Sequence, residues 1–408
     1  MLPSRYFCQT PVDLPAFPLP AGETDESLFR LLCEQGLIER YGNLVPQEAR
    51  DRLDYEMRTI EDRGIARLFL IVREYLDWTR SQGIGVGPGR TCASGSTAAY
   101  VLGITDIDPI EHAISTELFV EYPRDWPFMP SITASIEHER FREVRQHVAS
   151  RYGEDALPVM FPLIRGWLMG GFAPYAQGDL DLSVRAVGII SRTCRAIEKR
   201  TRERIDLEDL PLDDEAAFEM LRQDGVQGLV DLGRGAGEIR SAVLKRIAPR
   251  SLSDVAATVA LSRDTFERRR PEALGDYVRA KSGEAPLQLD GRFLPILQET
   301  GGIILYRDQI VQLGMQGAGF PPAQAVKLSK AAAKGNLKLL DTLRQPWCDG
   351  ARALGCPPDE AERMWNQIAT PFVSPFKVKS VEIAVLFVRA AFLQAHYPDD
   401  YRKALYPL

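Results

Sequence analysis

The spacing of apolar residues predicts that most of this chain is helical. In residues 46–63, Leu53, Met57 and Ile60 recur every three to four positions, which places them on one face of a helix. The same period occurs in residues 24–34, 66–82 and 137–152. The apolar run 383–392 predicts a helix buried in the core. The pattern therefore favours a globular protein built mainly from packed helices.

A short segment near residue 130 departs from the helical period. Its residues alternate between polar Ser131, Thr133 and Ser135 and apolar Ile132, Ala134 and Ile136. Because successive side chains of a strand point to opposite faces, this alternation predicts a strand with one polar face. That face is either half of a binding site or a solvated surface, and the sequence favours the solvated surface.

A glycine-rich loop occupies residues 83–97, with the sequence G-I-G-V-G-P-G-R-T-C-A-S-G-S-T. Glycines let backbone amides approach a ligand, and the helix predicted to begin near Ser94 would point its N–H groups at the loop. Arg90 adds a positive charge. The loop is thus a candidate anion site, and the alternative is that its glycines serve only a tight turn.

Cys92 lies beside the predicted start of that helix. A thiol in such a position can have a lowered pKa and act as a nucleophile. The simpler interpretation, an inert cysteine, is favoured.

Three motifs resemble the catalytic palm of the bacterial DNA polymerase III alpha subunit, a C-family polymerase. Residues 86–100 read V-G-P-G-R-T-C-A-S-G-S-T-A-A-Y, where the family has V-G-P-G-R-G-S-x-A-G-S-x-x-A-Y. Residues 103–109 read G-I-T-D-I-D-P, as in the family, and residues 130–136 read P-S-I-T-A-S-I against P-D-I-D-x-D-F. Residues 137–140, E-H-E-R, are most similar to the error-prone branch of the family.

This resemblance implies an α+β, mostly helical fold. It would contain a small mixed β-sheet palm of the nucleotidyltransferase (polymerase beta-like) type and a helical fingers domain. The implied domains are an N-terminal arm and helix (1–45), a palm-like domain without the thumb insertion (46–205) and a fingers-like domain (206–408). The family's phosphoesterase domain and sliding-clamp motif have no expected counterpart in this sequence.

The chain departs from the family at the residues that carry the chemistry. The two metal-binding aspartates of the family fall on Ser131 and Thr133, its Gly-Ser pair falls on Thr91 and Cys92, and a third aspartate aligns with Asp181. Two magnesium ions need carboxylate ligands, and neutral hydroxyls do not replace their charge. We therefore expect no magnesium site and no cofactor.

The resemblance also implies positions that bind phosphate or a nucleotide. In the loop these are Gly87, Gly89, Arg90, Thr91, Cys92 and Ser94, and in the fingers-like region they are Lys330, Lys334, Lys377 and Lys379. Catalytic candidates are limited to Asp181 and Cys92.

Charge and composition limit the partners. The net charge is −6, so nucleic-acid binding would be local, weak and salt-dependent. Basic strips occur at residues 245–246, 268–270 and 327–338, although each is also explained as a solvated helix face. The cysteines lack metal-binding spacing, and neither a signal peptide nor a membrane span is expected. These features predict a cytoplasmic protein with free thiols.

Three functions follow from these observations. The favoured one is a non-polymerising pseudo-enzyme that binds a nucleotide, nucleic acid or a partner protein. The second is an enzyme that uses the old cleft for another substrate through Arg90, Cys92, Asp181 and the fingers lysines. The third is residual nucleotidyl transfer, with Asp181 and a further carboxylate such as Asp179 or Glu137 holding metal.

Overall fold

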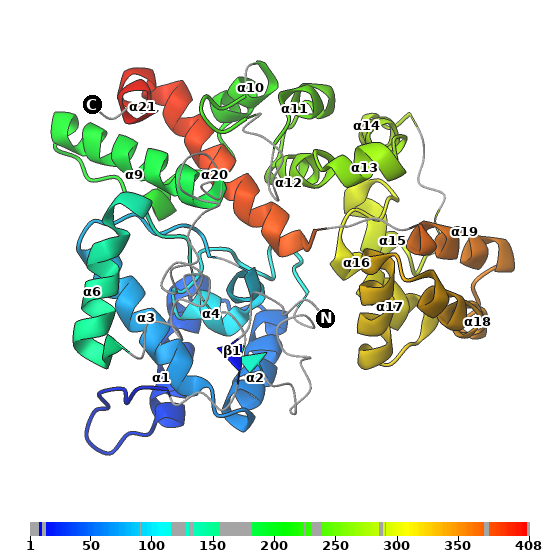
Figure 1. The fold of residues 1–408 in the computed structure, drawn as a ribbon, viewed down its shortest axis with the longest axis horizontal. Coiled ribbons are helices and arrows are strands. Elements are labelled where there is room, and N and C mark those ends of the chain that lie inside the picture. The colour runs from blue at the N-terminus through cyan, green and yellow to red at the C-terminus, as the bar shows by residue number, and fades with distance from the viewer. Residues whose placement is uncertain are drawn as a thin grey trace. The chain divides into compact units, whose positions relative to one another are not determined.

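The computed structural model describes residues 8–9, 14–89, 91–115, 128–129, 132, 134–154, 182–223, 225–230, 239–284, 289, 291–370 and 375–405. The chain divides into two compact units (Figure 1). Unit 1 contains Met1–Pro211 and His396–Leu408, and unit 2 contains Leu212–Ala395. The domain limits expected from the sequence are residues 1–45, 46–205 and 206–408, and these limits stay a prediction.

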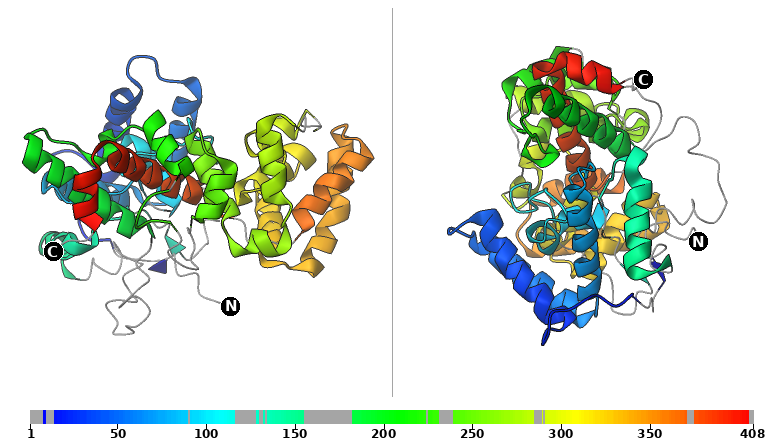
Figure 2. Two further views of the ribbon diagram at one scale, coloured as in Figure 1. Left: turned by 90° about the horizontal axis from the view of Figure 1, so that it is seen from above. Right: turned by 90° about the vertical axis from the view of Figure 1, so that its left-hand side faces the viewer.

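Unit 1 is mainly helical in its described residues. Its helices are α1 (Asp25–Tyr41), α2 (Gln47–Asp62), α3 (Ala66–Ser81), α4 (Thr97–Val101), α6 (Phe141–Tyr152), α9 (Leu182–Thr201) and α21 (Pro398–Leu405). Short 3-10 turns occupy Thr91–Gly95, His138–Arg140 and Leu207–Asp209. Helices α9 and α21 lie side by side in both sets of views (Figure 2).

The apolar stripes predict these helices because the apolar face of each helix packs into the core. Leu53, Met57 and Ile60 of α2 are all buried, as the period required. Helix α1 continues past residue 34, where the prediction ended. Its apolar face extends through buried Leu37, and Gly36 lets it approach the backbone of Val101 in α4.

Regular β-structure among the described residues is limited to two short pairings. Strand β1 (Cys8–Gln9) pairs antiparallel with β2 (Phe128–Met129), and Val86 forms an isolated antiparallel bridge with Ile136. The mixed palm sheet is not seen in this part of the chain. The predicted strand positions Ser131 and Thr133 lie outside the described residues.

Ser135 corrects the prediction of a solvated polar face. Its side chain is only 1% exposed, as is that of Glu137, and the apolar Ile132, Ala134 and Ile136 are buried as well. Helix α9 covers this segment together with the glycine loop: a Cβ on Gly87 would lie 2.8 Å from Val187 and 3.2 Å from Ser135. The alternating pattern is a local feature of the sequence and could not indicate this burial, because α9 follows Ser135 by about fifty residues.

All the regular secondary structure among the described residues of unit 2 is helical, as expected for a fingers-like region. Its helices are α10 (Glu215–Gln223), α11 (Ser241–Ile247), α12 (Leu252–Leu261), α13 (Asp264–Arg269), α14 (Ala273–Ser282), α15 (Leu294–Leu297), α16 (Arg307–Gln312), α17 (Pro322–Lys334), α18 (Leu337–Ala353), α19 (Pro358–Ala369) and α20 (Lys377–His396). A 3-10 turn spans Gln298–Thr300 and a π-helical turn spans Leu313–Gly317.

Aromatic side chains fill the core of unit 2. Trp347 is fully buried and packs near Phe293 and Trp365, with ring centroids 6.2 and 5.9 Å away. The predicted core helix is confirmed, because nearly every residue of α20 is buried. No helix among the described residues combines the length and apolar character that a membrane crossing requires.

Candidate functional site

The first half of the glycine loop is paired with the segment that follows Ser131 and Thr133. The Gly87 amide donates to the Ser135 carbonyl at 2.6 Å, and the backbone amide of Glu137 donates to the Gly85 carbonyl at 2.9 Å. The Gly85 amide donates in turn to the Glu137 carboxylate at 3.1 Å. The amides of Gly85 and Gly87 are therefore satisfied inside the protein rather than offered to a ligand.

The glycines of this loop allow close packing. A Cβ on Gly85 would collide with Ser191 of α9. Gly89 has a φ of +122° and no room for a side chain beside Thr105, whose hydroxyl donates to the Pro88 carbonyl. Ser94, another predicted ligand-binding residue, is fully buried against Gly89. At Gly85, Gly87 and Gly89 the loop is accordingly explained by packing.

The start of α4 is occupied by a buried carboxylate. Glu56, from α2, accepts from the amides of Thr97 and Ala98 at 3.1 and 3.0 Å and from the Ser96 hydroxyl at 2.7 Å. Arg52 neutralises Glu56, with a nitrogen 3.3 Å from its carboxylate. The expectation that this helix would direct free N–H groups at a ligand is thus wrong at its first turn, because Glu56 satisfies them.

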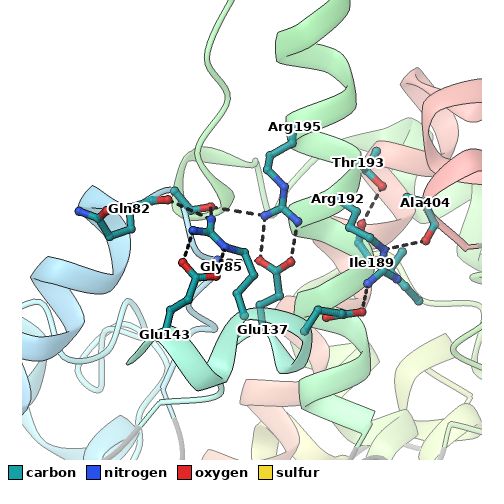
Figure 3. Close-up of polar contacts among 12 residues, drawn as sticks. Gln82, Gly85, Glu137, Glu143, Ile189, Arg192, Thr193, Arg195 and Ala404 are labelled. Carbon is teal, nitrogen blue, oxygen red and sulfur yellow. Dashed lines mark hydrogen bonds and ion pairs between the residues drawn. The ribbon is translucent and has the colours of Figure 1, made fainter. Parts of the chain in front are cut away.

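Three arginine–glutamate pairs lie near the glycine loop (Figure 3). Arg195 of α9 binds Glu137 with both ends of its guanidinium, at 2.5 and 2.8 Å. Arg192 pairs with Glu139. Arg140 pairs with Glu143 at 2.7 Å and donates to the Gln82 carbonyl at 3.0 Å. These contacts join the loop, residues 135–143 and α9 into one charged network.

This network occupies both carboxylate oxygens of Glu137. Both of its carboxylate oxygens accept hydrogen bonds, and its side chain is 1% exposed. A guanidinium at this distance repels a second cation. Glu137 is therefore unsuited to the metal-holding role considered in the third functional hypothesis.

Several predicted site residues lie outside the described part of the chain. These are Arg90, Ser131, Thr133, Asp179 and Asp181. Thr91 and Cys92 lie in the 3-10 turn that precedes α4. Among the described residues, no group of three or more histidine, cysteine, aspartate or glutamate side chains is arranged to hold a metal ion.

The four predicted fingers lysines fall into two kinds. Lys377 is buried and its Nζ lies 2.6 Å from Glu299, while Lys379 lies 3.1 Å from buried Glu382. Both cations are therefore used in ion pairs within unit 2, Lys377 with exposed Glu299 and Lys379 with buried Glu382.

Lys330 and Lys334 instead lie one turn apart on α17, and both are exposed. Partial burial of the ammonium, together with the charges of Arg307 and Lys334, lowers the pKa of Lys330. Arg307 packs its guanidinium 4.4 Å above the Phe376 ring. Arg307 is not among the binding residues predicted from the sequence. The structure thus gathers three cations, Arg307, Lys330 and Lys334, in one region of unit 2.

Two family models match the chain. Residues 27–161 match the bacterial DNA polymerase III alpha NTPase domain, and residues 186–355 match the bacterial DNA polymerase III alpha subunit finger domain. The matched segments lie mainly in unit 1 and unit 2, respectively. By sequence, the chain is therefore related to the alpha subunits of bacterial DNA polymerase III.

Curated relatives agree with these models. The DNA polymerase III alpha subunit of Thermus aquaticus is 24% identical, over 96% of this chain and 45% of its own length. The Mycobacterium tuberculosis H37Rv protein of the same name is 27% identical, over 97% of this chain and 43% of its own. This chain belongs to the DNA polymerase III alpha subunit family, and it spans less than half the length of these relatives.

The alignment also shows a difference inside the matched region. It extends over 558 residues of the Thermus aquaticus protein, whereas this chain has 408 residues in all. The relative thus carries residues within the aligned region that have no counterpart here. That these residues include the thumb stays a prediction.

Proposed function

We propose that this chain is a non-polymerising member of its family that binds the phosphates of a nucleotide through unit 2. It would keep a palm of the nucleotidyltransferase type as a scaffold, and it would act in the cytoplasm. The observation that carries the proposal is the gathering of Arg307, at the start of α16, with the exposed Lys330 and Lys334 of α17.

The loss of polymerisation is argued from the set of possible metal ligands. Ser131 and Thr133 stand where the family has aspartates, and hydroxyls do not neutralise two magnesium ions. Glu137, the nearest described carboxylate in the sequence, is held by Arg195. The residues therefore do not fit the family's two-metal centre, and we propose no metal-dependent step.

Phosphate binding is argued from the charges of α17. Lys330 and Lys334 are four residues apart, so their side chains leave the same face of the helix. Like charges at this spacing repel each other; the pKa of Lys330 is lowered first by partial burial and then by the charges of Arg307 and Lys334. An anion bound between them relieves the repulsion and gains charge-assisted hydrogen bonds.

The test is calorimetric titration with a deoxynucleoside triphosphate in the absence of magnesium. The double change Lys330→Glu and Lys334→Glu is expected to weaken binding at least about tenfold. Lys403→Glu, on α21 of unit 1, is the control with the same kind of charge reversal at an exposed lysine. Equal affinity of the double variant and the control would exclude this site, and the absence of any nucleotide binding would leave a partner protein as the better proposal.

A further inference from the structure

A second group of cations lies on α11 and α14 of unit 2, which pack against each other (Figure 1). Lys245 and Arg246 are exposed at the end of α11, Arg250 follows them, and Arg279 is exposed near the end of α14. In the sequence, residues 245–246 were indistinguishable from an ordinary solvated helix end. The packing of the two helices brings Arg246 and Arg279, which are distant in the chain, to the same place.

Gly275 of α14 marks the point at which the two guanidinium groups converge. A Cβ placed on this glycine would lie 3.4 Å from Nη2 of Arg246 and 3.4 Å from Nη1 of Arg279. An oxygen atom that accepts hydrogen bonds from both nitrogens would lie about 2.9 Å from each. The absence of a side chain at Gly275 thus leaves open the position that such an oxygen would occupy.

The surrounding charges favour an anion at this position. Arg246 forms no ion pair with any residue in the described part of unit 2. Arg279 pairs with Asp276, one turn earlier on its own helix. Lys281 is engaged elsewhere, 2.6 Å from Asp254. Two neighbouring guanidinium groups, of which only Arg279 is paired with a carboxylate, retain net positive charge, and a bound oxyanion relieves their repulsion.

We propose that Arg246 and Arg279 form a phosphate-binding site across Gly275. The planar guanidinium offers paired N–H donors that match the oxygens of a phosphate group. Lys245 and Arg250, which are close to Arg246 in the sequence, are also exposed and add to the positive charge of this part of unit 2. The site shares no residue with the lysine pair of α17 and does not depend on the function proposed above.

The test follows the thermal stability of the whole chain during a titration with inorganic phosphate. Sodium chloride at matched ionic strength corrects for general salt effects, and a specific site raises the melting temperature by mass action. Arg246→Gln is expected to weaken the apparent affinity about tenfold. Arg363→Gln on α19, an exposed arginine paired with Glu360, is the matched control and should leave the affinity unchanged.

Gly275→Ala separates binding from folding. Gly275 lies inside α14 without a positive φ, so alanine should maintain or raise the melting temperature of the free protein. Its methyl group would nevertheless occupy the oxygen position and reduce the response to phosphate. A response that survives in both Gly275→Ala and Arg246→Gln overturns the proposal, as does the absence of any response in the parent protein.

A second measurement identifies the source of the phosphate. Fluorescence anisotropy with a labelled single-stranded oligonucleotide is repeated at several salt concentrations. If the site binds the backbone of a strand, Arg246→Gln weakens oligonucleotide binding. It also reduces the slope of log affinity against log salt concentration by about one, the value for one lost phosphate contact. If it binds only free phosphate or phosphate monoesters, the oligonucleotide affinity of Arg246→Gln equals that of Arg363→Gln while the phosphate response is lost.

Discussion

At the scale of single residues, burial rather than charge count decides what each ionisable group does. Asp308 is the clearest case in unit 2. Its carboxylate accepts from the Lys377 amide at 2.6 Å, yet complete burial raises its pKa from 3.8 to about 6. The buried charge is therefore a cost to the folded state at neutral pH.

The pH dependence of this cost is testable. As the pH falls from about 6 to 4, folded Asp308 takes up a proton before the unfolded chain does, so its contribution to stability rises. Asp308→Asn keeps an oxygen for the Lys377 amide and lacks this titration. The free energy of unfolding of the parent protein, relative to this variant, should increase by about 2 kcal/mol over that range. Urea unfolding at several pH values measures it. Asp341→Asn, at an exposed position, should show no such trend.

At the scale of elements, the arginine–glutamate network attaches α9 to the glycine loop. Arg195 contributes both nitrogens to Glu137 and is itself 38% exposed, so water screens part of the interaction. Removing only the cation leaves a buried carboxylate with a single amide donor. Arg195→Met should therefore lower the free energy of unfolding by about 2 kcal/mol, less than for a fully buried pair.

A double-mutant cycle isolates this attachment. Glu137→Gln in the Arg195→Met background removes the unpaired charge and should restore part of the lost stability. Chemical denaturation of the four proteins gives the coupling free energy. Strictly additive losses would mean that the pair does not hold α9 to the loop.

At the scale of the whole molecule, the strongest prediction is the absence of template-directed DNA synthesis. Primer extension with magnesium or manganese should give no incorporation, because the family's paired aspartates are Ser131 and Thr133. Restoring both aspartates should not create processive synthesis, since the Gly-Ser pair of the family is also replaced. Incorporation by the parent protein that disappears in Asp181→Ala would contradict this prediction.

The sequence by itself determined the helices and the family of this protein. Helices α2 and α3 follow from apolar residues three and four positions apart, a signal contained within each helix. Family membership follows from the order of short motifs such as residues 103–109. Both kinds of information are local in the chain, so neither required knowledge of how the helices pack.

The tertiary structure alone decided which charged groups are exposed and which are held in ion pairs with known partners. Lys377 and Lys330 looked equivalent in the sequence, but Glu299 neutralises the first while the second stays exposed. Glu56 fills the start of α4 from another helix, and Arg246 meets Arg279 only because α11 packs on α14. Ion pairs and hydrogen bonds form between groups that folding brings within a few ångströms, and those groups are separated here by tens of residues.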